Sequence, residues 1–153
     1  MTWQQGTAVI DQLLNRGELE RVTPNPEFAL ASLDLCDTHI ATAQSSLSSD
    51  PVAAVAVAYD AARKALVALL LAQGLRPTHR GGHIAVTDAA SAQLDPPNRI
   101  GRQVDRIRRL RNDNEYPDAG APQASMENAA DAIAVARDAV QAAQLVLPHL
   151  SPF

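Results

Sequence analysis

The chain has 153 residues and a formal net charge of −4, and 46% of its residues are hydrophobic but only 3% aromatic. A chain of this length suits one domain and buries enough surface to fold without disulfides or a metal. Small aliphatic residues dominate, and the β-branched and aromatic residues form no alternating runs, which favours helix over strand. The composition therefore argues against a β-rich fold, and we expect an all-α protein.

The sequence also indicates the cellular compartment of the protein. Cys36 is the only cysteine, so an internal disulfide is impossible and a reducing compartment is expected. The first residues lack the basic and apolar regions of a signal peptide. The most apolar stretch, residues 52–72, contains Asp60, Arg63 and Lys64, whose charges are costly at a bilayer centre. We therefore expect a cytoplasmic protein without a membrane partner.

The first expected helix is short, over residues 7–16, and two prolines break the chain after it. Asn25 before Pro26 has the N-cap residue and first-turn proline of a second helix. The apolar residues that follow are spaced four and three apart, the period of one helix face. Cys36 belongs to this face, so it is predicted to be a buried structural thiol. The face consists of Ala29, Leu33, Cys36, Ile40, Ala43 and Leu47.

The third expected helix begins at Pro51 after the N-cap Asp50, and Gly74 ends it. Nearly every face of this helix is apolar, so it should be central. The short turn before it implies that it lies antiparallel to the second helix. A loop is expected over residues 75–82 and a short helix over residues 83–93.

The last two helices are expected over residues 99–115 and 123–147, with Asn98 capping the former and Pro117 following it. The predicted fold class is an all-α, up-down bundle of four main helices plus short extra helices. We treat residues 1–153 as one domain. Its core is at 25–147, and residues 1–24 form a short N-terminal helix and a linker.

Six of the twelve arginines lie within residues 99–111, together with one acid, Asp105. This segment carries +5, so the rest of the chain carries −9. A local basic field on an acidic protein indicates a specific anionic partner more than general coating of nucleic acid. The arginines are Arg99, Arg102, Arg106, Arg108, Arg109 and Arg111.

The end of this Arg-rich helix is unusual. Solvated charges and local pairs, such as Arg111 with Glu115 four residues on, are the ordinary interpretation of an Arg-rich helix. Asn112 and Asn114, however, are poor helix formers, and Tyr116 precedes the proline. A solvated helix does not require such an ending.

Two stretches resemble HEPN domains, small helical bundles of bacterial toxin–antitoxin and phage-defence systems. One is the apolar helix from Ala58 that continues into Gly-Leu-Arg-Pro and a loop with His79 and His83. The other is Arg-Arg-Leu-Arg-Asn-Asp-Asn-Glu-Tyr over residues 108–116, which is similar to the family's Arg-Asn-x-x-x-His segment in a variant that ends in Glu-Tyr. The resemblance covers residues 25–147.

The resemblance implies an active or ancestral metal-independent endoribonuclease that is a homodimer through the 99–116 helix. Arg111, Asn112 and Tyr116 would then form the catalytic site, while Arg108 and Arg109 would grip phosphate. Tyr116 occupies the histidine position. A phenol with a pKa of about 10 is a poor general base at neutral pH, although it can donate a hydrogen bond or stack on a base.

Other side chains are candidates for substrate binding. His79 and His83 lie on the loop that the resemblance places near the cleft, and Glu115 pairs with Arg111. Asp60 and Arg63 either form a buried polar patch or orient Arg111 and Asn112 from a neighbouring helix; both interpretations stay open. No third ligand with suitable spacing accompanies the two histidines, so we expect no metal and no cofactor. His39 and His149 are interpreted as ordinary surface or packing residues.

Three functions remain. The first is a dimeric protein of ribonuclease-toxin ancestry that binds RNA or a nucleotide through Arg111. The second is a catalytically inactive HEPN bundle that acts by protein association, as a scaffold or as the partner of an antitoxin or nucleotidyltransferase. The third is a generic monomeric bundle whose Arg-rich helix only faces water.

Overall fold

Helices dominate the part of the chain that the structure, a computed structural model, describes, which is residues 3–118, 120 and 123–153. The elements within these residues are α1 (Thr7–Asn15), β1 (Leu19–Arg21), α2 (Pro26–Ser46), α3 (Pro51–Ala72), β2 (Leu75–Pro77), α4 (Gly82–Leu94), α5 (Ile100–Glu115), α6 (Met126–Val146) and the 3-10 turn η1 (Leu147–His149).

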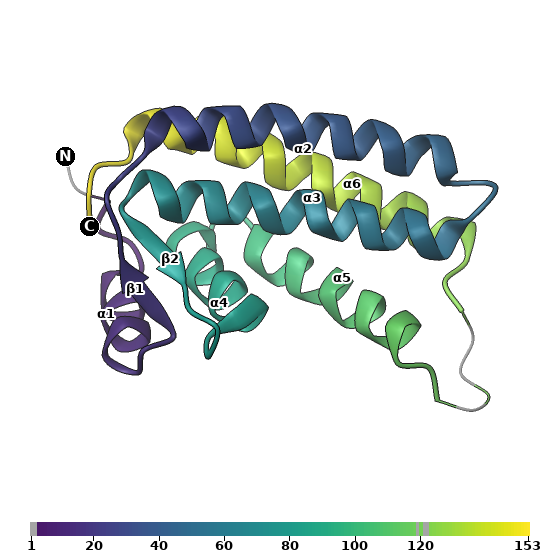
Figure 1. The fold of residues 1–153 in the computed structure, drawn as a ribbon, viewed down its shortest axis with the longest axis horizontal. Helices are drawn as coiled ribbons and strands as arrows, with labels where there is room; N and C mark the ends of the chain where they lie inside the picture. The colour runs from purple at the N-terminus through teal and green to yellow at the C-terminus, as the bar shows by residue number, and fades with distance from the viewer. Residues whose placement is uncertain (1–2, 119, 121–122) are drawn as a thin grey trace.

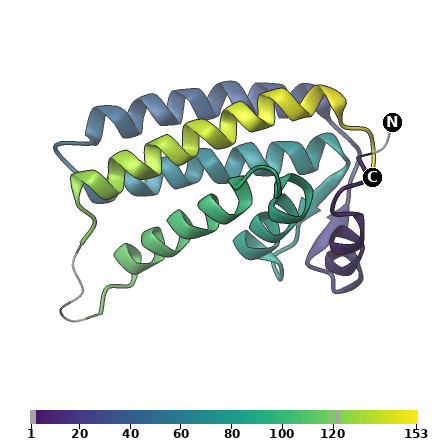
Figure 2. The ribbon, with the colours of Figure 1, turned by 180° about the vertical axis from the view of Figure 1, so that it is seen from behind.

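The four long helices α2, α3, α5 and α6 form a bundle. Helices α2 and α3 run antiparallel side by side, and α6 lies along their rear face (Figures 1 and 2). Helix α5 crosses below α3, and α1, α4 and the two strands gather at one end of the bundle. This arrangement confirms the predicted fold class, an all-α bundle of four main helices with shorter extra ones.

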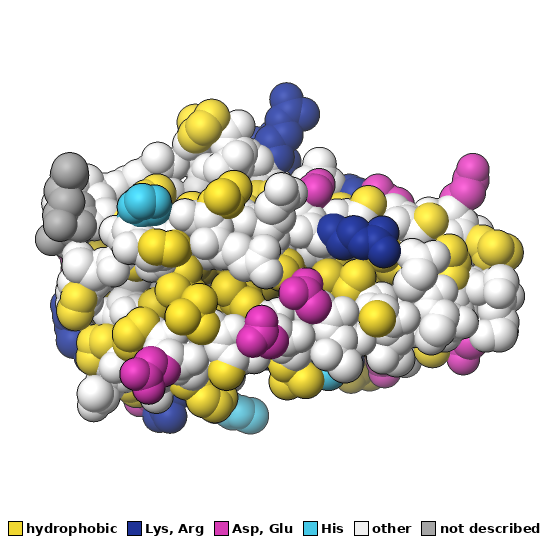
Figure 3. Space-filling model, turned by 90° about the horizontal axis from the view of Figure 1, so that it is seen from above, with side chains coloured by type: hydrophobic (Ala, Val, Ile, Leu, Met, Phe, Trp, Pro, Cys, Tyr) yellow, Lys and Arg dark blue, Asp and Glu magenta, His cyan; other side chains and the backbone are white. Residues whose placement is uncertain are grey.

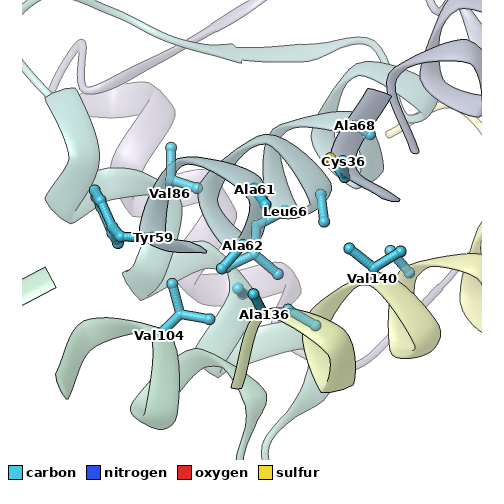
Figure 4. Close-up of a cluster of buried hydrophobic side chains, with 14 of the residues drawn as sticks. Cys36, Tyr59, Ala61, Ala62, Leu66, Ala68, Val86, Val104, Ala136 and Val140 are labelled. Atoms are coloured by element: carbon cyan, nitrogen blue, oxygen red, sulfur yellow. The ribbon is translucent and has the colours of Figure 1, made fainter. Parts of the chain in front are cut away.

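Helix α3 is the central helix, as its apolar sequence predicts. More than half of its residues are buried, and α2, α4, α5 and α6 pack against it; buried side chains of these helices lie around it in Figure 4. The labelled neighbours are Cys36 of α2, Val86 of α4, Val104 of α5, and Ala136 and Val140 of α6. The central helix therefore contacts every element that carries a candidate site residue.

The predicted apolar face of α2 packs against the core. Ala29, Leu33, Cys36, Ile40 and Ala43 are buried, and Leu47 is partly buried. Burial raises the pKa of the Cys36 thiol to about 11. The thiol therefore stays protonated near neutral pH and acts as a small apolar side chain.

The predicted loop at 75–82 is partly wrong, because its first residues form a strand. Strand β2 pairs antiparallel with β1, with Leu19 opposite Pro77 and Arg21 opposite Leu75. Both strands are only three residues long. Strands this short carry almost no periodic signal, and Pro77 stands at a strand end, where a missing N–H is tolerated.

Two helix starts also differ from the sequence prediction. Asn98 does not cap α5; the Asp95 carboxylate accepts a hydrogen bond from the Arg102 N–H at 3.1 Å instead. Helix α6 begins at Met126 and not at residue 123, because Ser125 and Asn128 form a reciprocal capping box. Side chains a few residues away therefore fix these boundaries.

Two contacts join the smaller elements to the bundle. A Cβ atom added to Gly101 of α5 would lie 2.3 Å from Ser91 Oγ of α4, so only glycine permits this approach. Gln73 and Gln93, both buried, exchange hydrogen bonds at 3.0 and 2.7 Å. The indole of Trp3 adds a hydrogen bond to the Gln93 carbonyl at 3.0 Å.

No helix in the described residues has the length and apolarity needed to cross a membrane.

Candidate functional site

A hydrogen bond between the buried Tyr59 of α3 and the exposed His83 of α4 lies in a polar cluster between α3, α4 and α5. The Tyr59 hydroxyl lies 2.9 Å from Nδ1 of His83, and Tyr59 is only 1% exposed. Burial raises the pKa of Tyr59 to about 12, although Arg63, Arg108 and Arg111 act in the opposite direction. The phenol therefore keeps its proton, and donating it to Nδ1 satisfies a hydroxyl that is otherwise cut off from water.

The His83 ring is held in its neutral form. Its partial burial lowers its pKa, and the positive charges of Arg63 and Arg111 lower the pKa further. Because Nδ1 accepts from Tyr59, the ring proton resides on Nε2. His83 is thus a neutral N–H donor beside arginines of two helices.

Asp60 organises the cations of α3. Its carboxylate pairs with Arg63 at 3.0 Å and with Lys64 at 3.4 Å. Burial alone would raise the pKa of Asp60, but the hydrogen bond and charge of Arg63 and the charge of Lys64 lower it. Asp60 is therefore ionised near neutral pH. Lys64 Nζ also lies 2.9 Å from Nε2 of His39 on α2.

Of the side chains described so far, Asp60, Lys64 and His39 border a cleft of about 360 Å³ between α2, α3 and α5. Arg111 reaches the cleft from α5, and Lys64 reaches it from α3, with side chains 31% and 33% exposed. Both cations are therefore partly desolvated and accessible. The cleft is lined by His39, Thr42, Ala56, Val57, Asp60, Lys64 and Arg111.

Three other arginines of α5 have acidic partners on α5 or on the neighbouring α6. Asp105 accepts from both Arg108 and Arg109, each at 2.9 Å, and Arg106 pairs with Asp131 of α6. Arg108 is largely covered, whereas the Arg109 side chain is 72% exposed. Arg108 therefore belongs to the polar cluster, and Arg109 lies at its rim.

The residues at the end of α5 do not all face the same way. Asn112 contacts Arg111 at 3.4 Å, and Glu115 lies 3.8 Å from it. Tyr116 is 79% exposed and borders a different recess, together with Asn114. Asn114 also accepts a hydrogen bond from the Ala124 N–H at 3.2 Å, which ties the residues just before α6 to the end of α5. Within one chain, Arg111 and Tyr116 thus line separate recesses.

The structure brings Asp60, Arg63, His83, Arg108 and Arg111 together in one neighbourhood. None of the contacts among the described residues joins His79, which is exposed in the turn before α4, to this neighbourhood. No group of three or more His, Cys, Asp or Glu side chains that could hold a metal ion occurs in the described ranges.

Sequence analysis did not identify two residues of the cleft, His39 and Lys64. His39 follows Cys36 by three positions and lies at the edge of the apolar face of α2, so it was interpreted as an ordinary surface or packing residue. Lys64 follows Asp60 by four positions and is the only lysine in the chain. A single lysine among twelve arginines was the available signal.

The fold and this site define a helical bundle with a partly covered arginine cleft beside its central helix. A family model described as the HEPN domain matches residues 33–146, so the chain belongs to the HEPN domain family. Neither the curated proteins nor the solved structures gave a match to the chain. The family assignment therefore rests on the family model and agrees with the fold.

Proposed function

We propose that this protein binds RNA or a nucleotide through phosphate in the cleft at Arg111. The observation that carries the proposal is the presence of Arg111 and Lys64, from two helices, in one cleft. Membership of the HEPN family, with its nuclease or nucleotide-binding ancestry, supports the same function.

The arrangement of cations suits phosphate. A guanidinium grips two phosphate oxygens at once, and its hydrogen bonds strengthen where water is partly excluded. Arg63 does not line the cleft; it pairs with Asp60 at 3.0 Å and so offsets the negative charge of that carboxylate. The exposed Arg109 would add attraction at the rim, where salt screens it.

The proposal includes a homodimer whose interface is formed by α5. In this dimer Arg111 and Asn112 of the two protomers approach one another. In that arrangement Tyr116 of each chain, exposed at the helix end, is available to stack on a base. Cleavage of the RNA needs a group that takes a proton from a ribose 2′-OH. The phenol of Tyr116 is a weak candidate for that role.

A second function is favoured by one observation, the position of Tyr116 in a recess away from Arg111. A bundle with this geometry can act by protein association alone, with an antitoxin, a nucleotidyltransferase or another scaffolded partner. Replacing Tyr116 with histidine separates the two functions. If the wild type leaves RNA intact and Tyr116→His cleaves it, the natural protein is a catalytically inactive bundle, and the second function is favoured.

Arg111→Ala tests the binding proposal, with Arg109→Ala as the matched control on the same helix. Loss of a charge-assisted phosphate contact weakens binding by about 10- to 100-fold, whereas removing the exposed Arg109 has an effect of about threefold or less. Fluorescence anisotropy with a labelled RNA oligonucleotide at fixed salt measures both. Equal affinity of wild type and Arg111→Ala would refute the proposal.

Sedimentation equilibrium tests the dimer. Wild type should sediment as a dimer, and Arg102→Glu, which inverts an exposed charge on α5, should shift it toward monomer. A monomeric wild type at micromolar concentration would remove the dimer from the proposal and leave phosphate binding intact.

A further inference from the structure

Lys64, one of the two cations on which the proposed function rests, is paired with a cleft residue that this function does not use, His39. Lys64 Nζ lies 2.9 Å from His39 Nε2, and Asp60 holds the same ammonium at 3.4 Å. An ammonium has hydrogens to give and no lone pair to accept with. Nε2 of His39 is therefore the acceptor, and the proton of its neutral ring resides on Nδ1.

This pairing gives the cleft a defined set of donors. Arg111 and Lys64 contribute cations, and the His39 ring, whose Nδ1–H is a neutral donor, lines the same space. The rest of the lining is the Thr42 side chain, the Asp60 carboxylate that pairs with Arg63 and Lys64, and the apolar Ala56 and Val57. The apolar part of the wall lowers the local dielectric and strengthens contacts with an anion.

The balance of charge indicates which anion fits. Asp60 is neutralised by Arg63 at 3.0 Å, which leaves the positive charges of Lys64 and Arg111 without an equally close acid. Glu115 is nearest to Arg111 at 3.8 Å, and its side chain is 47% exposed, so this pair contributes little. The cleft therefore offers about two positive charges.

A phosphate at the end of a chain or on a mononucleotide carries about −1.5 to −2 charges at pH 7 and has three terminal oxygens. A phosphate inside an RNA backbone carries about one negative charge and has only two free oxygens. The terminal group matches both the charge of the cleft and its three kinds of donor.

We propose that the cleft between α2, α3 and α5 selects a terminal phosphomonoester, held by Arg111, Lys64 and His39. The proposal rests on the proposed phosphate-binding function and narrows its ligand. The same chemistry occurs at a phosphorylated RNA end and on a free mononucleotide, so the experiment includes both.

The single lysine makes the test direct. Reductive methylation of the untagged protein with ¹³C-formaldehyde labels Lys64 and the N-terminal amine only, because the chain has no other lysine. The Lys64 methyl signal is then followed by NMR during titration with RNAs of one sequence. These carry a 5′-phosphate, a 3′-phosphate or hydroxyl ends, and adenosine monophosphate forms a separate titration.

At least one phosphorylated RNA should bind about tenfold more tightly than the hydroxyl RNA and should shift the Lys64 signal, since one more charge-assisted contact is formed. Anisotropy with unmethylated protein should give the same preference. Lys64→Met and His39→Phe should lower the preference toward unity. Arg16→Ala, which removes an exposed arginine at the end of α1 that is not part of the cleft lining, should retain it.

The possible failures are distinct. Equal affinity for phosphorylated and hydroxyl RNA, or an unmoved Lys64 signal, overturns the terminal-phosphate proposal and leaves RNA binding standing. Binding of the mononucleotide without any RNA supports the cleft proposal and removes RNA as its ligand. Absence of binding by every probe overturns both. Because the wild-type signal alone decides these outcomes, an unfolded variant does not affect the result.

Discussion

The two sides of α3 differ in chemistry. Toward α2 and α6 it presents small apolar side chains, and Ala58, Ala61, Ala62 and Ala65 are fully buried. Near the cleft the same turns present Asp60, Arg63 and Lys64, which pair with one another. The face over α2 and α6 shows acidic and hydrophobic side chains with few cations (Figure 3). One helix therefore carries an apolar packing surface and a charged cluster within the same turns.

The flanking helices show the same difference. Helix α2 carries three acids and neither lysine nor arginine, whereas α5 carries five arginines in its 16 residues. Both nevertheless reach the same cleft, α2 through His39 and α5 through Arg111. Mutations on the apolar side should thus change stability, and mutations on the polar side should change binding.

The largest expected effect lies on the apolar side. Leu33→Ala removes a side chain that is 1% exposed and should lower the free energy of unfolding by about 2–5 kcal/mol. Leu35→Ala, two positions along the same helix and 48% exposed, should change it by about 0.5 kcal/mol or less. Urea unfolding followed by circular dichroism measures both. Similar losses in the two variants would contradict the assignment of this face.

The next effect concerns how α5 is positioned. Gly101→Ala places a methyl group against Ser91, with the nearest atom at 2.3 Å, and should cost about 1–3 kcal/mol of unfolding free energy. The double variant with Ser91→Gly tests the cause, since it frees the side-chain part of the contact. An unchanged or higher stability of Gly101→Ala would show that α4 and α5 do not approach so closely.

A smaller effect should follow on the polar side from Tyr59→Phe. Phenylalanine fills the same space but removes the hydroxyl that bonds His83, at a cost of about 0.5–1.5 kcal/mol. The ¹⁵N chemical shifts of the His83 ring should then change from values typical of one tautomer to values typical of a mixture of both. If the tautomer is unaltered, the hydroxyl does not set it.

The smallest effect is a pH dependence of stability. The pKa of His83 in the folded protein is lowered by burial and by Arg63 and Arg111, so the unfolded chain takes up this proton more readily. The contribution of His83 is complete above about pH 6.5 and is lost as the pH falls through that value toward the folded pKa. Comparing wild type with His83→Gln by urea unfolding from pH 8 to pH 5 isolates it. Parallel curves would contradict this assignment.

Local signals predicted much of the fold. Asn25 with Pro26 and Asp50 with Pro51 mark the starts of α2 and α3 at the correct residues, because capping depends on neighbours in sequence. The apolar period identified the buried face of α2 for the same reason. The hydrogen bond from Arg102 to Asp95 at the start of α5 and the pairing of β1 with β2 were not predicted, since no short-range sequence pattern connects the residues that they join.

The candidate site was predicted in part. The Arg-rich segment and the resemblance indicated Arg111, and the structure places Asp60, Arg63, His83 and Arg108 in its neighbourhood. His39 lies on another helix, and its proximity to Arg111 depends on how α2, α3 and α5 pack. Side-chain direction at the end of α5, which separates Tyr116 from Arg111 within one chain, likewise depends on three-dimensional geometry.

The reciprocal bond between Gln73 and Gln93 has a consequence for how the molecule opens. Both amides are buried, and Trp3 attaches the N-terminal segment to the Gln93 backbone. Solvent reaches these amide protons only when the end of α3 separates from α4. Their hydrogen-exchange rates therefore report whether the first helix and the strands detach from the bundle before it unfolds or together with it.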